Sequence, residues 1–388
     1  MFKIRTVSIT LALVQLLSTS NYSIEKKSKI NQIVPKSRIE TVNDNNDENL
    51  VSSNVYKFYN EDGYPIYYRF DKKSGKYKNI SIFDDCNISS QQYGASQIDF
   101  KNRFDLLIEE PLIWKSLQNY YPEKDFASKE EAMFFYKEYF ENIYKCGCGY
   151  ASVANYVFHL YEGREEEFEK IFGYPIYTVD ETGYVDFNYE VFILNFFNYS
   201  VNQTYNNKSL IIDFMLKDFY FNQLQDYLKS EECRRILPDD FERWTKDQWN
   251  EWDKFTDARD KKIHRLNEKW INAKNIHLDF GILLDASFGY LYQYLMSYGV
   301  NFSQCTCIDE PNTFSMDDII ACDNFMLYKV DKNNEKYDVN DGIKSHYVYV
   351  TKITKDNKII VSSWGQKYIF DNQDANWTSK VLIKVNLH

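Results

Sequence analysis

The chain has 388 residues, of which 44% are hydrophobic and 18% aromatic, so it can build one large domain or two ordinary ones and is not a wholly disordered protein. Its formal net charge is −11, and Lys and Arg are scattered among acidic neighbours. Nucleic acids and anionic membrane surfaces bind through positively charged patches. The composition therefore argues against both as partners.

The first twenty residues have the order of a secretory signal peptide. Lys3 and Arg5 precede an apolar run at 7–17, and small residues follow it. The run is shorter than the about 20 apolar residues that cross a bilayer, and no later stretch has that pattern. We predict a signal peptide over 1–20 and a secreted or cell-surface protein with no integral membrane span. The alternative is an N-terminal segment with no targeting role.

Two segments of different composition follow. Residues 21–54 are rich in Asn, Asp, Ser, Lys and Glu, which is typical of a disordered linker. From Val55 onward, aromatic and β-branched runs are interrupted by "NEDG" and "KKSG", which are hairpin signals. We predict that residues 55–124 form a small β-rich accessory segment or a pro-region.

The remainder of the chain, 125–388, changes from helical to strand patterns. The spacing of apolar residues predicts helices at 125–144, 151–161, 189–197, 206–273 and 283–298. The end of the chain predicts strands in "HYVYVTKI", "IIVSSWGQKYIF" and "SKVLIKVNL", with a turn at "TKDNK". Helices first and an antiparallel sheet last describe an α+β domain.

The helical stretch at 206–273 is highly charged and carries a set of aromatic residues. Trp244, Trp249, Trp252 and Phe255 recur at spacings of 5, 3 and 3. This spacing places them on one face of a helix. We expect them to pack that helix onto the body of the domain rather than to form a platform for a ligand.

Seven cysteines are present, and two of them lie one residue apart in "YKCGCGYASVANYVFHLYEG". An odd number leaves at least one thiol unpaired within the chain. Cys146 and Cys148 could bind zinc with Cys305 and Cys307, although structural zinc sites usually have wider C-x(2–4)-C spacing. They could instead form disulfides, whose connectivity a sequence does not define. The third reading is that one of them is a catalytic nucleophile.

Cys148 has the setting of a nucleophile because a helical pattern begins directly behind it. Free N–H groups and the positive end of the helix dipole favour a thiolate at such a position. Gly149 leaves space for a substrate carbonyl to approach the backbone. Cys146 lies in the preceding loop on this reading and is a bystander or a disulfide partner.

A nucleophilic cysteine needs a base, and the chain has five histidines. His159 lies eleven residues along the same helix as Cys148, about 16 Å away, and is therefore out of reach. Three more histidines lack a sequence context that would make them the base. They are His264 and His277, at the end of the charged stretch, and His388, at the end of the chain. By elimination, His346 at the start of the strand "SHYVYV" is the base.

Three motifs occur in the order and context of a known family. They are "N-x5-C-G-Y-A-S", "S-H-Y-V-Y-V" and "S-S-W-G". Through them the stretch from Asp125 to His388 resembles papain-like cysteine peptidases, and it is similar above all to bacterial members, among them secreted and bacteriocin-processing peptidases. The resemblance implies a helical lobe that carries the Cys and a β lobe that carries the His. The Cys–His separation exceeds the roughly 130–150 residues of papain-type enzymes, and 206–273 is the natural insertion.

The resemblance also implies roles for individual residues. Cys148 would be the nucleophile and His346 the base. The family has a Gln six residues before its Cys, where a side-chain amide helps to stabilise the oxyanion. That position is Asn142 here, whose shorter amide can still donate a hydrogen bond.

The third member of the family's site is an Asn or Asp that leads into Ser-Trp-Gly. That position is Ser362 here, and its hydroxyl would orient the imidazole. Gln366 or Asp371 could act in its place, since the predicted hairpin sets residues near 365 opposite the histidine. Trp364 would shield the imidazole from water, the alternative being plain core packing.

These observations predict a secreted papain-like thiol hydrolase, most simply a cysteine peptidase that acts on a peptide or protein through an acyl-enzyme, with no cofactor. The same machinery also serves amidases and acyltransferases. The alternative is a surface or binding protein that keeps the fold without activity, since Ser362 and Asn142 both depart from the family's pattern. A zinc-stabilised module is the third reading. The sequence defines neither the substrate nor the oligomeric state.

Overall fold

The computed structural model of the chain describes residues 50–52, 55–59, 65–71, 76–79, 83, 93–179, 185–280, 282–300, 302–309, 325–330, 345–353, 358–371 and 381–387. The predicted signal peptide and most of the predicted linker lie outside these residues. One part of the linker lies inside them, because Leu50–Ser52 form strand β1. The predicted linker boundary at residue 54 thus falls between strands β1 and β2 (Val55–Tyr59).

Strand β1 belongs to a four-stranded antiparallel sheet in the order β1-β2-β3-β4. The other strands are β2 (Val55–Tyr59), β3 (Pro65–Asp71) and β4 (Lys76–Asn79). Consecutive strands pair with each other, and Tyr56 lies opposite Tyr68 in the β2–β3 register. The strands predicted on either side of "NEDG" and "KKSG" are confirmed.

The predicted β-rich segment is not β throughout. Its second half forms helices α2 (Asp99–Asn102), α3 (Phe104–Leu107) and α4 (Pro111–Tyr120). These helices bury Phe100, Leu107 and Ile113 completely, in the same core as Val153 and Phe158. The stretch from α2 to α4 is therefore packed into the main core, so the second half of the segment predicted as β-rich is helical. The accessory or pro-region role of 55–124 stays a prediction.

Helices α5 (Lys129–Cys146) and α6 (Cys148–Leu160) are separated by Gly147 alone. Helix α5 begins after Ser128, whose hydroxyl accepts a hydrogen bond from the N–H of Glu131. Gly147 has no room for a side chain, since a Cβ there would lie 2.3 Å from the carbonyl oxygen of Ile143. This close approach lets one helix end and the next begin within a single residue. Cys148 is consequently the first residue of α6.

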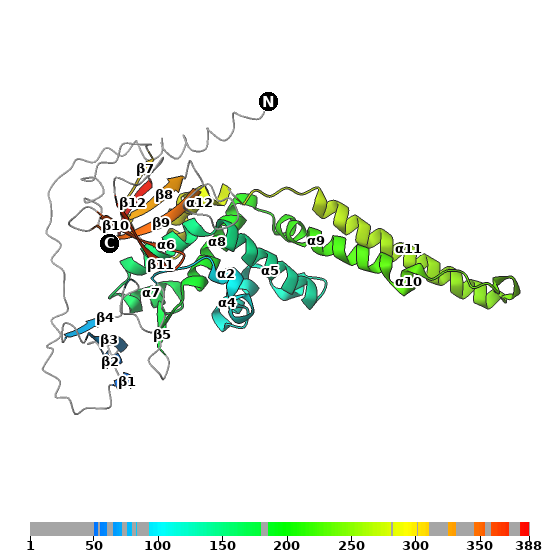
Figure 1. Cartoon of the computed structure of the whole chain (residues 1–388), viewed down its shortest axis with the longest axis horizontal. Helices are drawn as coiled ribbons and strands as arrows, with labels where there is room; N and C mark the ends of the chain where they lie inside the picture. Colours follow the sequence, from blue (N-terminus) through cyan, green and yellow to red (C-terminus); the bar gives the residue numbers. More distant parts are fainter. Residues whose placement is uncertain are drawn as a thin grey trace. The chain divides into compact units, whose positions relative to one another are not determined.

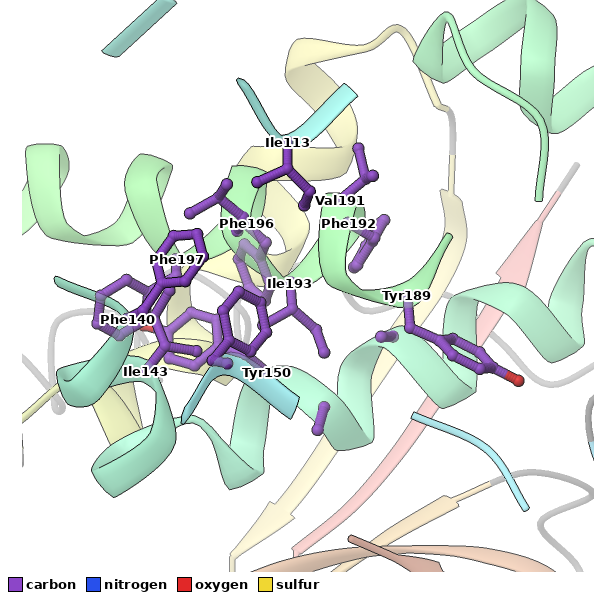
Figure 2. Packing of buried hydrophobic residues seen from close by; sticks show 14 of the residues in the cluster. Ile113, Phe140, Ile143, Tyr150, Tyr189, Val191, Phe192, Ile193, Phe196 and Phe197 are labelled. Atoms are coloured by element: carbon purple, nitrogen blue, oxygen red, sulfur yellow. The ribbon is translucent and has the colours of Figure 1, made fainter. Parts of the chain in front are cut away.

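Helix α6 is buried on all sides from Cys148 to Phe158, as expected of a helix that is apolar all round. The helices that pack against it include α8 (Tyr189–Tyr205) and α12 (Ile282–Ser297). Figure 2 shows Tyr150 of α6 close to Phe197 of α8, and the centroids of these two rings are 5.0 Å apart. The predicted helices at 151–161, 189–197 and 283–298 correspond to α6, α8 and α12. Helix α7 (Glu165–Phe172), which was not predicted, ends at Gly173 in the left-handed conformation.

The charged stretch at 206–273 forms a helical hairpin. Its parts are α9 (Lys208–Lys229), α10 (Glu231–Arg234), a 3-10 turn at Phe241–Arg243 and α11 (Lys246–Lys274). Helices α9 and α11 run antiparallel, side by side (Figure 1), so that Lys269 lies over the ring of Tyr220 and Lys262 over that of Tyr227. The prediction of helix in this stretch is confirmed.

The tryptophans of this hairpin pack on one another rather than on the body. The ring centroid of Trp244 lies 5.3 Å from that of Trp249 and 5.9 Å from that of Trp252. Trp252 lies 5.4 Å from Phe255, and Arg235 covers both of these rings. None of the four aromatic rings belongs to the main core. Their spacing does bring them together, but in a cluster that closes the end of the hairpin, so the predicted packing onto the body is wrong.

The strands after α12 form two antiparallel sheets, one in the order β11-β10-β9-β8 and one that pairs β12 with β7. Their bounds are β7 (Phe302–Asp309), β8 (Phe325–Val330), β9 (Ser345–Ile353), β10 (Lys358–Ser363), β11 (Gln366–Asp371) and β12 (Val381–Leu387). The stretch "IIVSSWGQKYIF" is thus two strands, β10 and β11. A short hairpin of β5 (Tyr177–Val179) and β6 (Val185–Phe187) lies between the helices along the chain.

Strand β9 packs against helix α6, which joins the helical part of the protein to the sheet. The mixture of helices and antiparallel sheets confirms the predicted α+β class. None of the helices in the described ranges is long and apolar enough to cross a membrane.

Candidate active site

Cys148 begins helix α6 and lies inside the protein, with 4% of the residue exposed. The backbone amides of Cys148 itself, Gly149 and Tyr347 lie near its sulfur, and each of them lowers the pKa of the thiol. Burial raises the pKa of the Cys148 thiol to about 11, and the three N–H groups lower it only in part. The resting thiol is therefore protonated at neutral pH, and a nucleophilic role requires a group that takes its proton.

The amide of Tyr347 brings strand β9 to this sulfur. The N–H belongs to the peptide that joins His346 to Tyr347, so the donor nitrogen is bonded directly to the carbonyl carbon of His346. His346 is itself buried, with 7% exposed. The structure thus brings β9 at Tyr347 near the first residue of α6, although the two lie far apart in the sequence.

Ser363 and Trp364 hold the imidazole of His346. The hydroxyl oxygen of Ser363 lies 2.6 Å from Nε2, and the Trp364 ring stacks on the imidazole with centroids 4.2 Å apart and 22° between the planes. Ser363 is 5% exposed, so water does not compete for this hydrogen bond. When Nε2–H donates to the hydroxyl, the bond fixes both the tautomer and the orientation of the ring.

The turn that carries Trp364 is strained. Trp364 and Gly365 connect β10 to β11 with φ angles of +49° and +70°, as in a type I′ hairpin. Asn or Asp followed by Gly usually fills such a turn, and a residue without that freedom costs about 1–3 kcal/mol there. A tryptophan occupies the position all the same, and its ring covers His346. Backbone strain of this kind clusters at functional sites.

Ser362 does not contact the imidazole, contrary to the role implied by the resemblance. Its hydroxyl donates to the carbonyl oxygen of Tyr93 at 2.5 Å and accepts a hydrogen bond from Nδ2 of Asn155 at 3.2 Å. Successive side chains of a strand point to opposite faces. Ser362 therefore faces α6, and the next residue, Ser363, meets His346.

Asn142 also lies away from the predicted site. Its Nδ2 donates to the carbonyl oxygen of Glu138 at 2.8 Å and to the sulfur of Met215 in α9 at 3.4 Å. Because α5 continues unbroken to Cys146, Asn142 projects from a helix and its amide is engaged by α5 and α9. The structure therefore does not support Asn142 as an oxyanion donor.

The other candidates from the sequence lie elsewhere. Gln366 is exposed and pairs with Ser363 across the turn. Asp371 ends β11, and its side chain lies outside the described residues. His159, at the far end of α6, has its Nδ1 2.9 Å from the hydroxyl of Tyr349, and burial lowers its pKa. His264 is exposed and lies 3.1 Å from Glu268. His159 and His264 are thus engaged away from Cys148.

Cys146 is the last residue of α5, and its thiol donates to the carbonyl oxygen of Asn142 at 2.8 Å. Burial raises its pKa, and the neighbouring Cys148 adds to this effect. Cys146, Cys148 and Cys233 are all free thiols, so the two cysteines of "CGC" are not disulfide partners here. No group of three or more metal-binding side chains occurs within the described ranges. The side chains of Cys305 and Cys307 lie outside those ranges, and the zinc reading stays a prediction.

Two residues of this site were missed from the sequence. Ser363 stood within the motif "S-S-W-G", but the motif does not show which of the two serines meets the histidine. Asn155 gave no signal, since its hydrogen-bond partners lie 60 and 207 residues away in the chain. Contacts of that separation follow only from the fold.

The structure therefore joins an imidazole and a hydroxyl on β9 and β10, and it brings the amide of Tyr347, the next residue along β9, near the buried thiol of Cys148. An imidazole can take and return a proton, the hydroxyl orients it, and backbone N–H groups can stabilise a negative charge. Comparisons with protein-family models, with curated proteins and with solved structures found no match to this chain. The chemistry of the site thus rests on its own geometry.

Proposed function

We propose that the protein is a secreted thiol hydrolase, most simply a cysteine peptidase, with Cys148 as the nucleophile and His346 as the base. The observation that carries this proposal is the packing of strand β9 on helix α6, which sets the Tyr347 amide near Cys148 on a strand whose His346 ring is held by Ser363 and Trp364. A thiol, an oriented base and N–H groups at a helix start are the parts that acyl transfer needs. The resemblance of the sequence to papain-like peptidases supports the same fold and function.

In the proposed reaction the sulfur of Cys148 attacks a carbonyl carbon of the substrate while His346 takes the thiol proton. Because Ser363 holds Nε2, this proton transfer is assigned to Nδ1. The N–H groups of Cys148 and Gly149 stabilise the oxyanion. His346 then donates the proton to the leaving amine, and the C–N bond breaks. Water attacks the resulting thioester with His346 as base, which releases the acid and restores the thiol.

The raised pKa of Cys148 favours one order of events. A thiol with a pKa of about 11 is scarcely ionised at neutral pH. His346 would therefore remove the proton as the sulfur attacks rather than hold a preformed thiolate. The rate of acyl-enzyme formation then depends on His346 being neutral, and activity should fall as the pH is lowered and His346 becomes protonated.

A second candidate function is a surface or binding protein that retains this arrangement without turnover. The low exposure of Cys148 and His346, at 4% and 7%, favours it, since a substrate must reach both groups. A small acyl donor separates the two candidates because it needs less space than a peptide.

The experiment uses p-nitrophenyl acetate with the purified full chain. A burst of nitrophenol and an acetyl group on Cys148, located by mass spectrometry, is expected from acyl-enzyme formation. Cys148→Ala and His346→Gln should abolish both signals. Cys146→Ala, two residues away, and His264→Gln, an exposed histidine, are matched controls and should retain them. Acetylation that avoids Cys148, or that persists in His346→Gln, would contradict the proposed mechanism.

Peptide bond cleavage is then tested with a fluorescently labelled, unfolded protein substrate. Fragments that wild type produces and Cys148→Ala does not would identify a peptidase. An acetyl-enzyme without any protein cleavage would instead favour an amidase or acyltransferase of narrower specificity.

A further inference from the structure

One buried network of hydrogen bonds lies outside the proposed catalytic pair. It is centred on Asn155 and on a segment that we call the strap, residues Tyr93–Gln97. The Oδ1 of Asn155 accepts a hydrogen bond from the N–H of Ala95 at 2.7 Å, and its Nδ2 donates to Ser362 at 3.2 Å. Asn155 is 2% exposed. Both ends of its amide are thus used, one on the strap and one on strand β10.

The strap is fixed to three elements. The N–H of Tyr93 donates to the carbonyl oxygen of Gly365 at 2.8 Å, and the N–H of Gly365 donates to that of Ala95 at 3.1 Å. Gln97 donates to the carbonyl oxygen of Tyr144, near the end of α5, at 3.0 Å. The strap therefore links the turn between β10 and β11 to α6 and to the end of α5.

The bonds of this network end on both sides of the residues that hold the imidazole. Ser362 immediately precedes Ser363, and Gly365 immediately follows Trp364. Asn155 lies seven residues after Cys148 on the same helix, about 10 Å along its axis. The helix that carries the nucleophile is thereby connected, through Asn155, to the turn that holds the base.

We infer that Asn155 is a positioning residue, which sets the Ser363–Trp364 turn, and with it the His346 ring, relative to Cys148. The inference rests on the proposed function for its catalytic meaning. Only an amide of this length both accepts from Ala95 and donates to Ser362, since a carboxylate lacks the donor and an alkyl group lacks both. A fully connected buried network of this kind specifies one arrangement of the parts it joins.

The test compares Asn155→Leu with Ser362→Ala and Ser362→Thr, each in the full chain. Asn155→Leu and Ser362→Ala should lower the rate of acetyl-enzyme formation by about ten- to a hundredfold, as expected of a misplaced base. Ser362→Thr keeps the hydroxyl and should restore most of the rate. Asn202→Leu is the control, because Asn202 also donates its amide to a main-chain oxygen, at 2.8 Å, in the neighbouring helix α8.

A second readout does not depend on any activity. The ring ¹⁵N resonances of His346, assigned with His346→Gln, report the tautomer and the hydrogen bond at Nε2. They should shift in Asn155→Leu and in Ser362→Ala but not in Asn202→Leu. Unshifted resonances in a folded Asn155→Leu or Ser362→Ala variant would overturn the positioning role. The resonances could shift in both variants while the wild-type protein forms no acetyl-enzyme. That result would uphold the positioning role of Asn155 and refute the proposed function.

Discussion

Gly94 offers a direct measure of how tightly the strap packs against the site. Its φ is +85°, and a Cβ added to it would lie 2.4 Å from the hydroxyl oxygen of Ser362 and 2.5 Å from Oδ1 of Asn155. Gly173 has almost the same φ, +78°, but nothing lies within 4 Å of its added Cβ. Gly94→Ala and Gly173→Ala therefore share the backbone strain and differ in the steric conflict.

The expected magnitudes follow from these contacts. A left-handed alanine costs about 1–2 kcal/mol, and the lower entropy of the unfolded alanine chain offsets about 0.4–1 kcal/mol of this. Gly173→Ala should thus lose about 1 kcal/mol. Gly94→Ala must in addition displace Ser362 or Asn155 and break a buried hydrogen bond, which costs about 1–3 kcal/mol more. The total loss is about 2–4 kcal/mol.

Thermal unfolding followed by circular dichroism measures the difference. At about 2 °C for each kcal/mol in a protein of this size, Tm should fall by about 2 °C in Gly173→Ala and by about 4–8 °C in Gly94→Ala. Gly299→Ala, at φ +76° with open space around it, should match Gly173→Ala. Equal losses at Gly94 and Gly173 would show that the strap does not lie against Ser362 and Asn155.

Three further outcomes are expected. Trp364→Asn places a residue that tolerates positive φ in the turn and relieves about 1–3 kcal/mol of strain while it removes a stack worth about 0.5–1.5 kcal/mol. The Tm should therefore stay the same or rise, while the rate of acetyl-enzyme formation falls. A fall in both the Tm and the rate would contradict the inferred backbone strain at Trp364. Burial, followed by the charge of Asp99, raises the pKa of Glu190, against the opposing effect of Arg103, whose guanidinium lies 3.6 Å away. The stabilising contribution of Glu190 is therefore full below its ordinary pKa of 4.5 and is lost as the pH rises through its raised pKa in the folded protein. In Glu190→Gln, the Tm should consequently decrease less steeply above pH 5 than in the wild type. An unchanged pH profile would refute this. Iodoacetamide should modify Cys148 more slowly than the partly exposed Cys233 in the native protein at neutral pH, and equally fast in urea. Preferential labelling of native Cys148 would show instead that the thiol is already ionised.

The helical half of the protein could be predicted from local patterns. The helices α5, α6, α8, α9, α11 and α12 all begin or end within a few residues of the predicted spans, because apolar periodicity and caps act over one or two turns. The position of Cys148 at a helix start follows from the same local information. The helices α2 to α4 were missed, since they are short and owe their stability to the burial of residues such as Phe100 and Leu107.

The sheet shows where local information ends. Strands β10 and β11, which pair tightly from Ser363 and Gln366 onward, were not separated in the sequence because "IIVSSWGQKYIF" has the pattern of one long β run. A register shift between Ile360 and Val361 leaves Thr351 as an extra residue of β9. Such a bulge changes which side chains of a strand face which side. A motif with two adjacent serines therefore could not define which of them meets the histidine.

The sequence by itself determined the α+β class, the helix that begins at Cys148 and the strand that begins at Ser345, since each depends on residues that are neighbours in the chain. Tertiary structure decided the partners of those residues. It engaged Asn142 with α9, set Ser363 rather than Ser362 on the imidazole, and joined Asn155 to the strap. The physical reason is that hydrogen bonds between distant segments depend on the register and packing of whole elements, which no short stretch of sequence encodes.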